Sequence, residues 1–519
     1  MRSVIFHNSN TAAQEKCRGW PQAWRRKQEL RSARTSKPKI LILIRVVAMH
    51  AETNDLAPST SFSRAIDIAA SRRATTSTLA AAADLSSLVE PSFSFSHRPG
   101  LFDEAGRLML KNLTLPELEE WCLSVAGEPA KRAKQLYRWL YGTRKWIRNL
   151  DQADGDPQAF SAEFKSKVFS GASLEGGLQL QSVHTARDGT RKLVFALLGA
   201  EQGGPARGTH GTVETVLIPM TNRSGENLRY TACLSTQVGC AMNCQFCYTG
   251  RMGLLANLTT AQIVEQVVEA RRYLAEQSVP IRIANIVFMG MGEPLHNYDS
   301  VMATIEILAT GLELSRNKII VSTVGLVPEM RKFIAAGTAK LAVSLHATTD
   351  EVRDWIVPTN RRYPLDQLLG ALRESFPYDK RKGDDFVVIE YVLLAGVNDT
   401  LEDAQRLLAL TSDIYCLVNL IVFNPHEGTP FRRSADESVR AFRGVFLTAG
   451  RPCTVRTSKG DDEMAACGQL GDVNLSARPA PMLKPPDALA ARLVGTGAGT
   501  VATPLVMAGE TGSGCCGGN

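Results

Sequence analysis

One stretch, residues 230–247, decides most of what the sequence predicts; it is YTACLSTQVGCAMNCQFC. Its first part, residues 230–238, is a run of apolar and small polar side chains typical of a strand. Three cysteines then follow within eight residues, Cys240, Cys244 and Cys247, in the pattern CxxxCxxC. Because thiolates are soft ligands, three of them on one loop predict a metal site at the end of a strand.

Two kinds of metal site fit this spacing. A closed structural zinc site uses four ligands, so a fourth Cys or His would have to come from elsewhere in the chain. A 4Fe–4S cluster held by three cysteines keeps one iron open, and that iron can bind a substrate or cofactor. Phe246, directly before the third cysteine, can shield a cluster from water. The spacing favours the cluster and leaves zinc as the alternative.

The overall composition indicates a globular protein without a disulfide framework. The chain has 519 residues, of which 44% are hydrophobic and 21% charged, and this excludes a wholly disordered protein. Its 11 cysteines are odd in number and unevenly spaced, which favours a reducing compartment. No apolar run approaches the ~18 residues of a membrane-spanning helix, so no membrane partner is expected.

Downstream of the cysteines, short apolar runs alternate with longer amphipathic segments. Such alternation is typical of parallel strands joined by crossover helices, and it predicts an α/β fold. At this length a full or partial (β/α) barrel fits, with its chemistry at the carboxyl ends of the strands. The predicted strands are residues 283–289, 318–324, 339–346, 385–394 and 417–423, and the predicted helices are residues 260–274, 300–309, 327–335, 364–374, 401–410 and 439–447.

Polar residues lie at the ends of these predicted strands. The first strand ends in FMGMGEP, residues 288–294, whose glycines let a ligand approach the backbone and whose Glu293 can hold an amino group. Ser322, Ser344, His346 and Asn424 end later strands. A polar residue at one strand end is common, but in a barrel all of these side chains would converge on one mouth.

Residues 106–205 are predicted to form a small accessory domain. It contains a helix starting at Leu115 with Thr114 as its cap, a second helix over residues 130–140, and a hairpin at residues 178–184 and 192–198. Basic residues interleaved with Trp139, Tyr141 and Trp146 favour an RNA-binding patch with stacking rings, and a solvated helix face over core aromatics is the alternative. The basic residues are Lys131, Arg132, Lys134, Arg138, Arg144, Lys145 and Arg148.

Both ends of the chain differ from the middle in composition. The first hundred residues hold 15 Lys and Arg against 7 Asp and Glu, whereas the rest of the chain has a net charge of −1. Residues 1–105 are therefore predicted to be an organelle transit peptide, with a disordered extension or a true start at Met49 as alternatives. Residues 206–475 are predicted to form the core domain. Residues 476–519, which follow it, are predicted to be a disordered tail. Cys515 and Cys516 in this tail could bind metal, although an inert tail is favoured.

Taken together, the motifs resemble a known family. CxxxCxxC with an aromatic before its last cysteine, followed by Gly-Glu-Pro, resembles the radical S-adenosylmethionine superfamily. The segments CLSTQVGC (233–240), MGMGEP (289–294), SLH (344–346) and GDDEMAACGQL (460–470) resemble its RNA adenine methyltransferases of the RlmN and Cfr type. The resemblance covers about residues 114–474. It implies a partial (β/α) TIM-like barrel of radical SAM type with a small N-terminal helical accessory domain that contacts RNA.

The resemblance also implies a role for each candidate site residue. Cys467 matches the cysteine that is methylated as an intermediate, Cys233 the second redox cysteine, and Glu214 the proton acceptor. The implied ligands of the 4Fe–4S cluster are Cys240, Cys244 and Cys247, and the implied contacts to S-adenosylmethionine are Gly292, Glu293, Ser322, Ser344, Leu345, His346 and Asn424.

The chemistry explains why two cysteines remote in sequence are needed. The adenine ring carbon that receives the methyl group is not nucleophilic, so it cannot take the methyl directly from S-adenosylmethionine. A cysteine thiolate is nucleophilic and can take the methyl group first. A 5′-deoxyadenosyl radical then takes a hydrogen from the methyl on Cys467, and the carbon radical adds to the ring. Cys233 finally attacks Cys467 and releases the product, leaving a disulfide. Without the resemblance, both residues would be interpreted as structural thiols.

The implied activity is methylation of carbon 2 of adenosine in 23S-type ribosomal RNA, with tRNA left open as a further substrate. The alternatives are methylation at carbon 8 of the same adenosine, a non-enzymatic iron–sulfur or zinc redox protein, and another radical enzyme such as an activase. The expected partners are ribosomal RNA and a one-electron donor such as a ferredoxin or flavodoxin. A transit-type N-terminus favours a plant or algal member in the chloroplast, with mitochondrion and cytoplasm as alternatives.

Overall fold

The structure is a computed structural model. It describes residues 94–95, 98–142, 145–198, 211–222, 224, 226–279, 282–380, 383, 385–456, 458–472, 474 and 479–490. Residues 1–93 of the predicted transit segment, Arg144, and the pair Cys515 and Cys516 lie outside the described residues.

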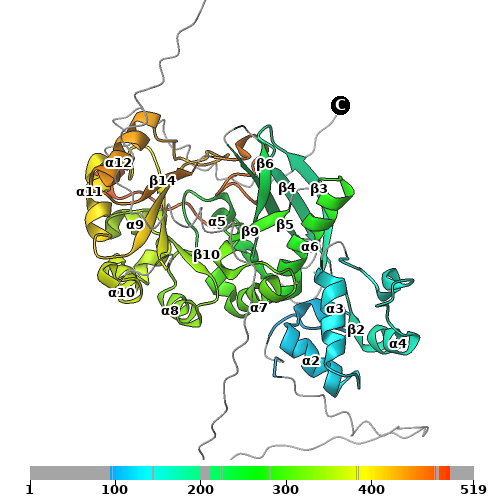
Figure 1. Cartoon of the computed structure of the whole chain (residues 1–519). Helices are drawn as coiled ribbons and strands as arrows, with labels where there is room; N and C mark the ends of the chain where they lie inside the picture. Colours follow the sequence, from blue (N-terminus) through cyan, green and yellow to red (C-terminus); the bar gives the residue numbers. More distant parts are fainter. Residues whose placement is uncertain are drawn as a thin grey trace, which may run out of the picture. The chain divides into compact units, whose positions relative to one another are not determined.

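A ten-stranded sheet forms the centre of the described part of the chain (Figure 1), in the order β14-β13-β12-β11-β10-β9-β6-β5-β4-β3. All neighbours from β6 to β14 are parallel, and β5, β4 and β3 are added antiparallel. Within the described ranges β14 and β3 do not pair with each other, so the barrel is partial, and the predicted fold class is confirmed. The strands are β3 Leu178–Thr185, β4 Arg191–Leu197, β5 Thr212–Thr221, β6 Asn227–Cys233, β9 Ile283–Phe288, β10 Ile319–Thr323, β11 Lys340–Ser344, β12 Val387–Leu393, β13 Cys416–Val422 and β14 Cys453–Arg456.

Helices join the parallel strands and cover the outside of the sheet (Figure 1). Side chains that point outward from a strand pack beneath them, as Tyr391 of β12 does against Phe442 of α12, with 5.4 Å between ring centroids. All six predicted helices are confirmed, whereas α9 and the edge strand β14 were not predicted because both are short and largely polar. The helices are α6 Thr260–Glu276, η3 Pro294–Asn297, α7 Tyr298–Thr310, η4 Arg316–Lys318, α8 Val327–Ala336, α9 Asp350–Ile356, η5 Pro358–Arg361, α10 Leu365–Ser375, η6 Tyr378–Lys380, α11 Leu401–Leu410 and α12 Asp436–Thr448.

The single strand predicted at residues 230–238 is wrong, because the segment forms two strands. β6 ends at Cys233, and β7 (Gln237–Cys240) pairs with β8 (Gly253–Asn257) in a separate hairpin. Between them, Leu234 O accepts a hydrogen bond from Gly290 N at 3.0 Å, and Ser235 Oγ accepts one from Met291 N at 2.9 Å. The chain leaves the sheet there to bind the loop after β9, a partner that the local sequence does not show.

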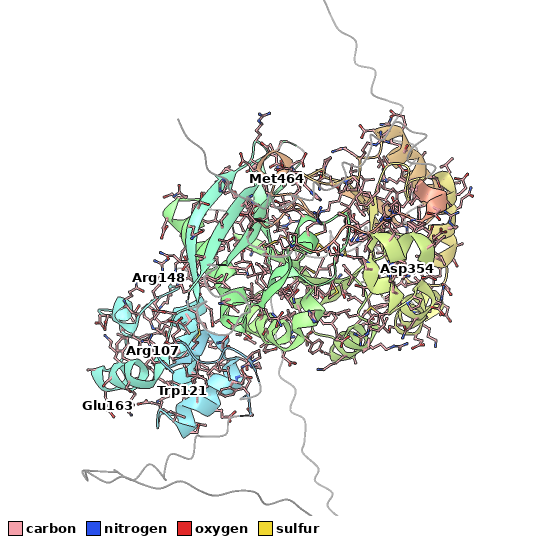
Figure 2. All side chains as sticks on the ribbon, turned by 180° about the vertical axis from the view of Figure 1, so that it is seen from behind. Arg107, Trp121, Arg148, Glu163, Asp354 and Met464 are labelled. Carbon is pink, nitrogen blue, oxygen red and sulfur yellow. The ribbon has the colours of Figure 1, made fainter. Side chains whose placement is uncertain are left out.

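The accessory region before the sheet consists of short helices. Helix α2 begins at Leu115 as predicted, where the Glu117 carboxylate accepts a hydrogen bond from Thr114 N at 2.7 Å. Trp121 of α2 and Glu163 of α4 lie in this region, far from Asp354 of α9 (Figure 2). Its elements are β1 Leu108–Met109, η1 Leu110–Asn112, α2 Leu115–Ser124, α3 Lys131–Tyr141, η2 Leu150–Ala153, α4 Ala162–Gly171 and β2 Ala172–Ser173.

The boundaries of this helical region differ from the predicted 106–205. Phe95 and Leu101 are already buried, so packing begins before residue 106. The predicted hairpin forms as β3 and β4 but belongs to the main sheet, so the helices end near Gly171. The apolar face predicted for the second helix is buried through Leu136, Tyr137 and Leu140 of α3.

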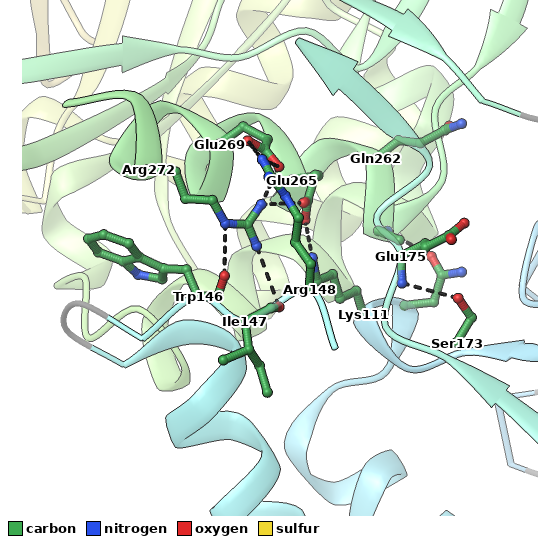
Figure 3. A network of polar contacts seen from close by, with 12 residues as sticks. Lys111, Trp146, Ile147, Arg148, Ser173, Glu175, Gln262, Glu265, Glu269 and Arg272 are labelled. Atoms are coloured by element: carbon green, nitrogen blue, oxygen red, sulfur yellow. Dashed lines mark hydrogen bonds and ion pairs between the residues drawn. The ribbon is translucent and has the colours of Figure 1, made fainter. Parts of the chain in front are cut away.

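A network of charges, all buried except Arg148, joins the accessory region to α6 (Figure 3). Lys111 Nζ lies 2.6 Å from Glu265 Oε2, and Arg272 Nη1 lies 3.1 Å from Glu265 Oε1. Arg272 also pairs with Glu269, which in turn binds Arg148 at 2.9 Å. Burial opposes ionisation of Glu265, but Lys111 and Arg272 outweigh it and hold the pKa of that carboxyl below its usual range. The paired charges therefore fix the accessory helices on the barrel.

The basic run of the accessory region is largely paired with acids. Lys134 lies 3.6 Å from Glu119, Lys145 3.6 Å from Asp156, and Arg148 2.9 Å from Glu269. The prediction that Trp139 and Tyr141 stack on bases is wrong, because both rings are buried in the core. Lys131 and Arg138 are exposed and form no ion pair with any described residue, so they are the free cations among the described residues of this run.

Residues 479–490 pack against the loop of the motif cysteines, unlike the disordered tail predicted from residue 476. Leu483 N donates to Gln245 Oε1 at 2.6 Å, and Leu483 O accepts from Trp355 Nε1 at 3.0 Å. Leu489 is buried. In the part of the chain that the structure describes, no helix is both long and apolar enough to cross a membrane.

Candidate active site

The three motif cysteines lie on the loop between β7 and the short helix α5 (Tyr248–Arg251). Cys240 ends β7, and Cys247 directly precedes α5. The loop is held by hydrogen bonds from Cys247 N to Cys244 O at 3.0 Å and from Tyr248 N to Gly468 O at 2.8 Å. All three thiols are free and line one cavity inside the barrel, which we call the cofactor cavity.

Six of the seven residues expected to contact the cofactor line this same cavity. They come from the loop after β9 and from the ends of β10, β11 and β13, so the predicted convergence of strand ends is observed. Leu345 is the exception: its side chain is fully buried in the core, and its backbone N donates to Glu390 O at 3.0 Å. The six lining residues are Gly292, Glu293, Ser322, Ser344, His346 and Asn424.

Gly292 and Glu293 place a carboxyl group in the cavity. Gly292 has φ +97°, and a Cβ there would fall 2.5 Å from the Cβ of Gln237, so glycine is required. The Glu293 carboxylate accepts hydrogen bonds from Val324 N at 2.9 Å and Leu295 N at 3.1 Å. Burial nevertheless raises the pKa of Glu293 to about 7. A cationic amino group would stabilise its ionised form.

His346 presents a neutral imidazole to the cavity. Burial, with Arg353 as a second cause, lowers the pKa of His346 to about 3. Nδ1 accepts a hydrogen bond from Val392 N at 3.0 Å, which leaves the proton of the neutral ring on Nε2. The ring meets Phe246 edge-on, with centroids 5.0 Å apart. His346 can therefore donate one hydrogen bond to a ligand in a water-poor site.

Cys467 and Cys233, remote in sequence, come together at a second cavity. Cys467 follows η7 (Asp461–Glu463) and lines both the cofactor cavity and the second one, whereas Cys233 lines only the second. Asn424 Nδ2 donates to Cys467 O at 3.3 Å and holds this loop. Burial raises the pKa of Cys233 to about 12 and also raises that of Cys467. Cys467 is thus the thiol that faces both cavities.

Glu214 does not line either cavity. It lies on β5, and its Oε2 accepts a hydrogen bond from Gly471 N at 2.9 Å, while Oε1 lies 3.5 Å from Lys192 Nζ. Burial raises the pKa of the Glu214 carboxyl, which increases its affinity for a proton. Its position links β5 to the loop that carries Cys467.

Comparisons with known proteins agree with this geometry. Residues 234–408 match the model of the radical SAM superfamily. The dual-specificity RNA methyltransferase RlmN of Pelobacter propionicus is 44% identical over 71% of this chain and 98% of the relative, and that of Geotalea uraniireducens is 43% identical over 70% and 96%. The chain belongs to the RlmN family. A crystal structure of a radical SAM methyltransferase from Sphaerobacter thermophilus, 37% identical, covers 70% of this chain and 98% of its own with a TM-score of 0.60.

The RlmN family uses a 4Fe–4S cluster and S-adenosylmethionine, and the donor set of the loop fits the cluster. Burial raises the pKa of all three motif thiols, so metal binding must displace their protons. The described His, Cys, Asp and Glu side chains contain no group of three arranged for one ion. A cluster needs no such convergence, because each thiolate binds a different iron.

Two polar residues that line both cavities of this RlmN-family site were not predicted from the sequence. Arg456 ends β14 and lines both cavities. Burial raises the pKa of Cys467, and the positive charge of Arg456 partly offsets this rise. No signal pointed to Arg456, because β14 itself was not predicted. Glu390 on β12 also lines both cavities. An acid inside the apolar run FVVIEYVLL, residues 386–394, is the signal that could have found it.

Proposed function

We propose that this chain is a radical SAM RNA methyltransferase that methylates carbon 2 of adenosine in 23S-type ribosomal RNA, and in tRNA, through an S-methyl intermediate on Cys467. One observation carries the proposal: Cys467 lines the cavity of the three motif cysteines and also the second cavity, where it meets Cys233. A thiol in this position can accept a group on one side and deliver it on the other.

In this proposal, Cys240, Cys244 and Cys247 hold the cluster, and Glu293 binds the amino group of S-adenosylmethionine. Ser322, Ser344, His346 and Asn424 line the rest of the cofactor cavity. When bound, the reduced cluster and S-adenosylmethionine supply a 5′-deoxyadenosyl radical. Burial of the surrounding side chains excludes water from this reactive species.

The cysteines and Glu214 carry the transfer itself. The Cys467 thiolate attacks the methyl carbon of S-adenosylmethionine and releases S-adenosylhomocysteine. The hydrogen atom lost from this methyl goes to the 5′-deoxyadenosyl radical, and the methyl carbon then bonds to the adenine ring. The one unpaired electron left on the ring would return to the bound cluster. Glu214 lies beside the loop of Cys467 rather than in either cavity, and we assign the ring proton to it because burial raises the pKa of its carboxyl. Cys233 attacks the sulfur of Cys467, a disulfide forms, and the carbon leaves with the electron pair and is protonated.

The test is reconstitution of the protein under anaerobic conditions with defined ribosomal RNA and tRNA fragments. We expect about four irons per chain, formation of 5′-deoxyadenosine on reduction, and 2-methyladenosine among the nucleosides separated by mass spectrometry. Stoichiometric zinc without cofactor cleavage would refute the enzymatic proposal. An 8-methyl product would refute the assignment to carbon 2.

We further propose a ferredoxin or flavodoxin as electron donor and the chloroplast as location. The support for the location is the excess of basic over acidic residues in the first hundred, 15 against 7, in a segment rich in Ser and Ala. A fluorescent protein fused after residue 105 should enter plastids. Retention in the cytoplasm, or entry into mitochondria, would overturn this location.

A further inference from the structure

A row of polar residues crosses four neighbouring parallel strands. The strand register pairs Ser344 with Glu390, Glu390 with Asn419, and Asn419 with Thr454. Asn419 Nδ2 lies 2.9 and 3.1 Å from the two carboxylate oxygens of Glu390. Asn419 Oδ1 accepts a hydrogen bond from Thr454 Oγ1 at 2.8 Å. Thr454 therefore fixes the amide of Asn419, and Asn419 fixes the carboxyl of Glu390.

Glu390 is short of partners for so buried a group. It is 4% exposed, and Asn419 is the side chain that donates to it among the described residues. Both oxygens share the one Asn419 amide donor, whereas a carboxylate can accept about four hydrogen bonds, so each oxygen keeps further accepting capacity. Arg456, which lines the same cavity, supplies a charge nearby but no hydrogen bond to Glu390 within the described residues. The carboxyl is thus available to a ligand.

The cavity that Glu390 lines has the volume and the walls of a site for a small ligand. Its volume is about 430 Å³, which is within the usual range for small-molecule sites. Cys233 and Cys467 line it as well, so a ring bound there lies within reach of both thiols. Its other walls are mainly apolar, and a flipped base is bound by stacking against such side chains. They include Val216, Ile218, Met220, Val287, Met289 and Ile421.

We propose that this cavity receives the target adenine and that Glu390, oriented by Asn419, accepts a hydrogen bond from the exocyclic amino group of the base. The inference rests on the proposed function and adds the residues that select the base. Adenine offers an amino donor at this position, whereas guanine offers an oxygen, which a carboxylate oxygen repels. Glu390 therefore acts as a specificity-determining residue.

The test compares two RNA substrates in two proteins. One RNA carries adenosine at the target position, and the other carries purine riboside, which keeps carbon 2 but lacks the amino group. In the wild-type holoenzyme we expect kcat/KM to fall about 10- to 100-fold for the purine RNA, the usual cost when one specific hydrogen bond to a base is missing. With Glu390→Ala the two RNAs should react almost equally, because the group that distinguishes them is gone.

A conservative variant and a second position keep the test decisive. Glu390→Gln retains an acceptor oxygen of similar shape and should keep most of the discrimination. If Glu390→Ala does not fold, Asn419→Ala serves in its place. This variant should lose part of the discrimination between the two RNAs, because Asn419 no longer orients the Glu390 carboxyl. The same ratio in the wild type and both Ala variants would overturn the inference, as would a change confined to binding of S-adenosylmethionine. A wild type that leaves adenosine RNA unmodified would instead contradict the proposed function.

Discussion

The two cavities of the barrel and the contact between the accessory helices and α6 both bury ionisable side chains, but in opposite ways. At the contact, Lys111 and Arg272 are paired with Glu265 and lower the pKa of that carboxyl, although burial opposes this and itself lowers the pKa of Lys111 and raises that of Glu269. In the cofactor cavity, Glu293 and His346 form no ion pair with a described residue, and burial moves their pKa values to about 7 and about 3.

The difference separates structure from function. A buried charge that is fully paired within the chain has no need of a ligand, and its role is to fix two segments in one arrangement. A buried titratable group without a paired charge destabilises the fold, so its presence in a cavity indicates that a ligand completes its environment. In the barrel, the groups that lower stability in this way lie at the strand ends, where the cofactor and the substrate base are proposed to bind.

The largest expected effect comes from the cysteine that faces both cavities. Cys467→Ala should lower RNA methylation by at least about 10³-fold, because removal of a nucleophile abolishes the covalent route. Cys233→Ala should instead stall with RNA joined to Cys467, which denaturing gel electrophoresis detects as a covalent adduct. Both variants should bind iron like the wild type.

Cys416→Ala is the matched control, since Cys416 is also a free buried thiol but packs in the core under the sheet. It should remain active and form no adduct. Normal product from either Cys467→Ala or Cys233→Ala would show that these thiols only pack, and the contrast between cavity and core cysteines would then fail.

The parts of this site that a contiguous motif encodes were predictable from the sequence. CxxxCxxC and Gly-Glu-Pro place their residues on single loops, and the alternation of apolar runs with amphipathic helices places the strand ends that carry Ser322 and Ser344 at one mouth. Each of these signals is local, so no knowledge of distant partners is needed.

The unpredicted parts depend on partners far away in the sequence. The strand at residues 230–238 breaks because the loop after β9 binds Leu234 and Ser235. The basic run is neutralised in part by Glu269 of α6, and Arg456 belongs to a short edge strand. A local pattern contains none of these contacts, and tertiary packing alone creates them.

Removing one partner from the buried ion pairs between the accessory region and α6 should destabilise the protein more than removing one partner from an exposed ion pair. Glu265→Ala leaves Lys111 and Arg272 buried without their partner, so the free energy of unfolding should fall by about 3–5 kcal/mol. Glu374→Ala, which removes the exposed partner of Arg331, is the control and should change it little. Urea unfolding of the apoprotein measures both. An equal, small effect of the two substitutions would mean that the network contributes nothing to the docking of the accessory helices.

Burial of His346 in the cofactor cavity should make the stability of the fold depend on pH. The pKa of His346 is about 3 in the folded protein, against 6.5 when unfolded, so between these values the unfolded chain binds a proton that the folded protein does not. Stability should therefore fall as pH falls below 6.5, by about 2 kcal/mol at pH 5 from this group. His346→Gln should remove this part of the slope, whereas substitution of the exposed His184 should not. A slope unaffected by His346→Gln would show that the imidazole is accessible to protons in the folded state.

The smallest expected effect concerns RNA binding by the accessory region, where two cations among the described residues of the basic run form no ion pair. Lys131 and Arg138 are exposed on α3 without an ion pair to any described residue, whereas Lys134 is paired with Glu119. Removing one cation that binds a phosphate should reduce the log–log salt slope of RNA affinity by about one. Lys131→Gln with Arg138→Gln should therefore lower the slope by about two units, and Lys134→Gln by less, since its charge is already engaged. Filter binding between 50 and 200 mM salt, roughly the range over which phosphate binding responds to salt, measures the slopes. If the double substitution leaves the slope unchanged, α3 is a solvated face, and the RNA is held by other cations of the protein.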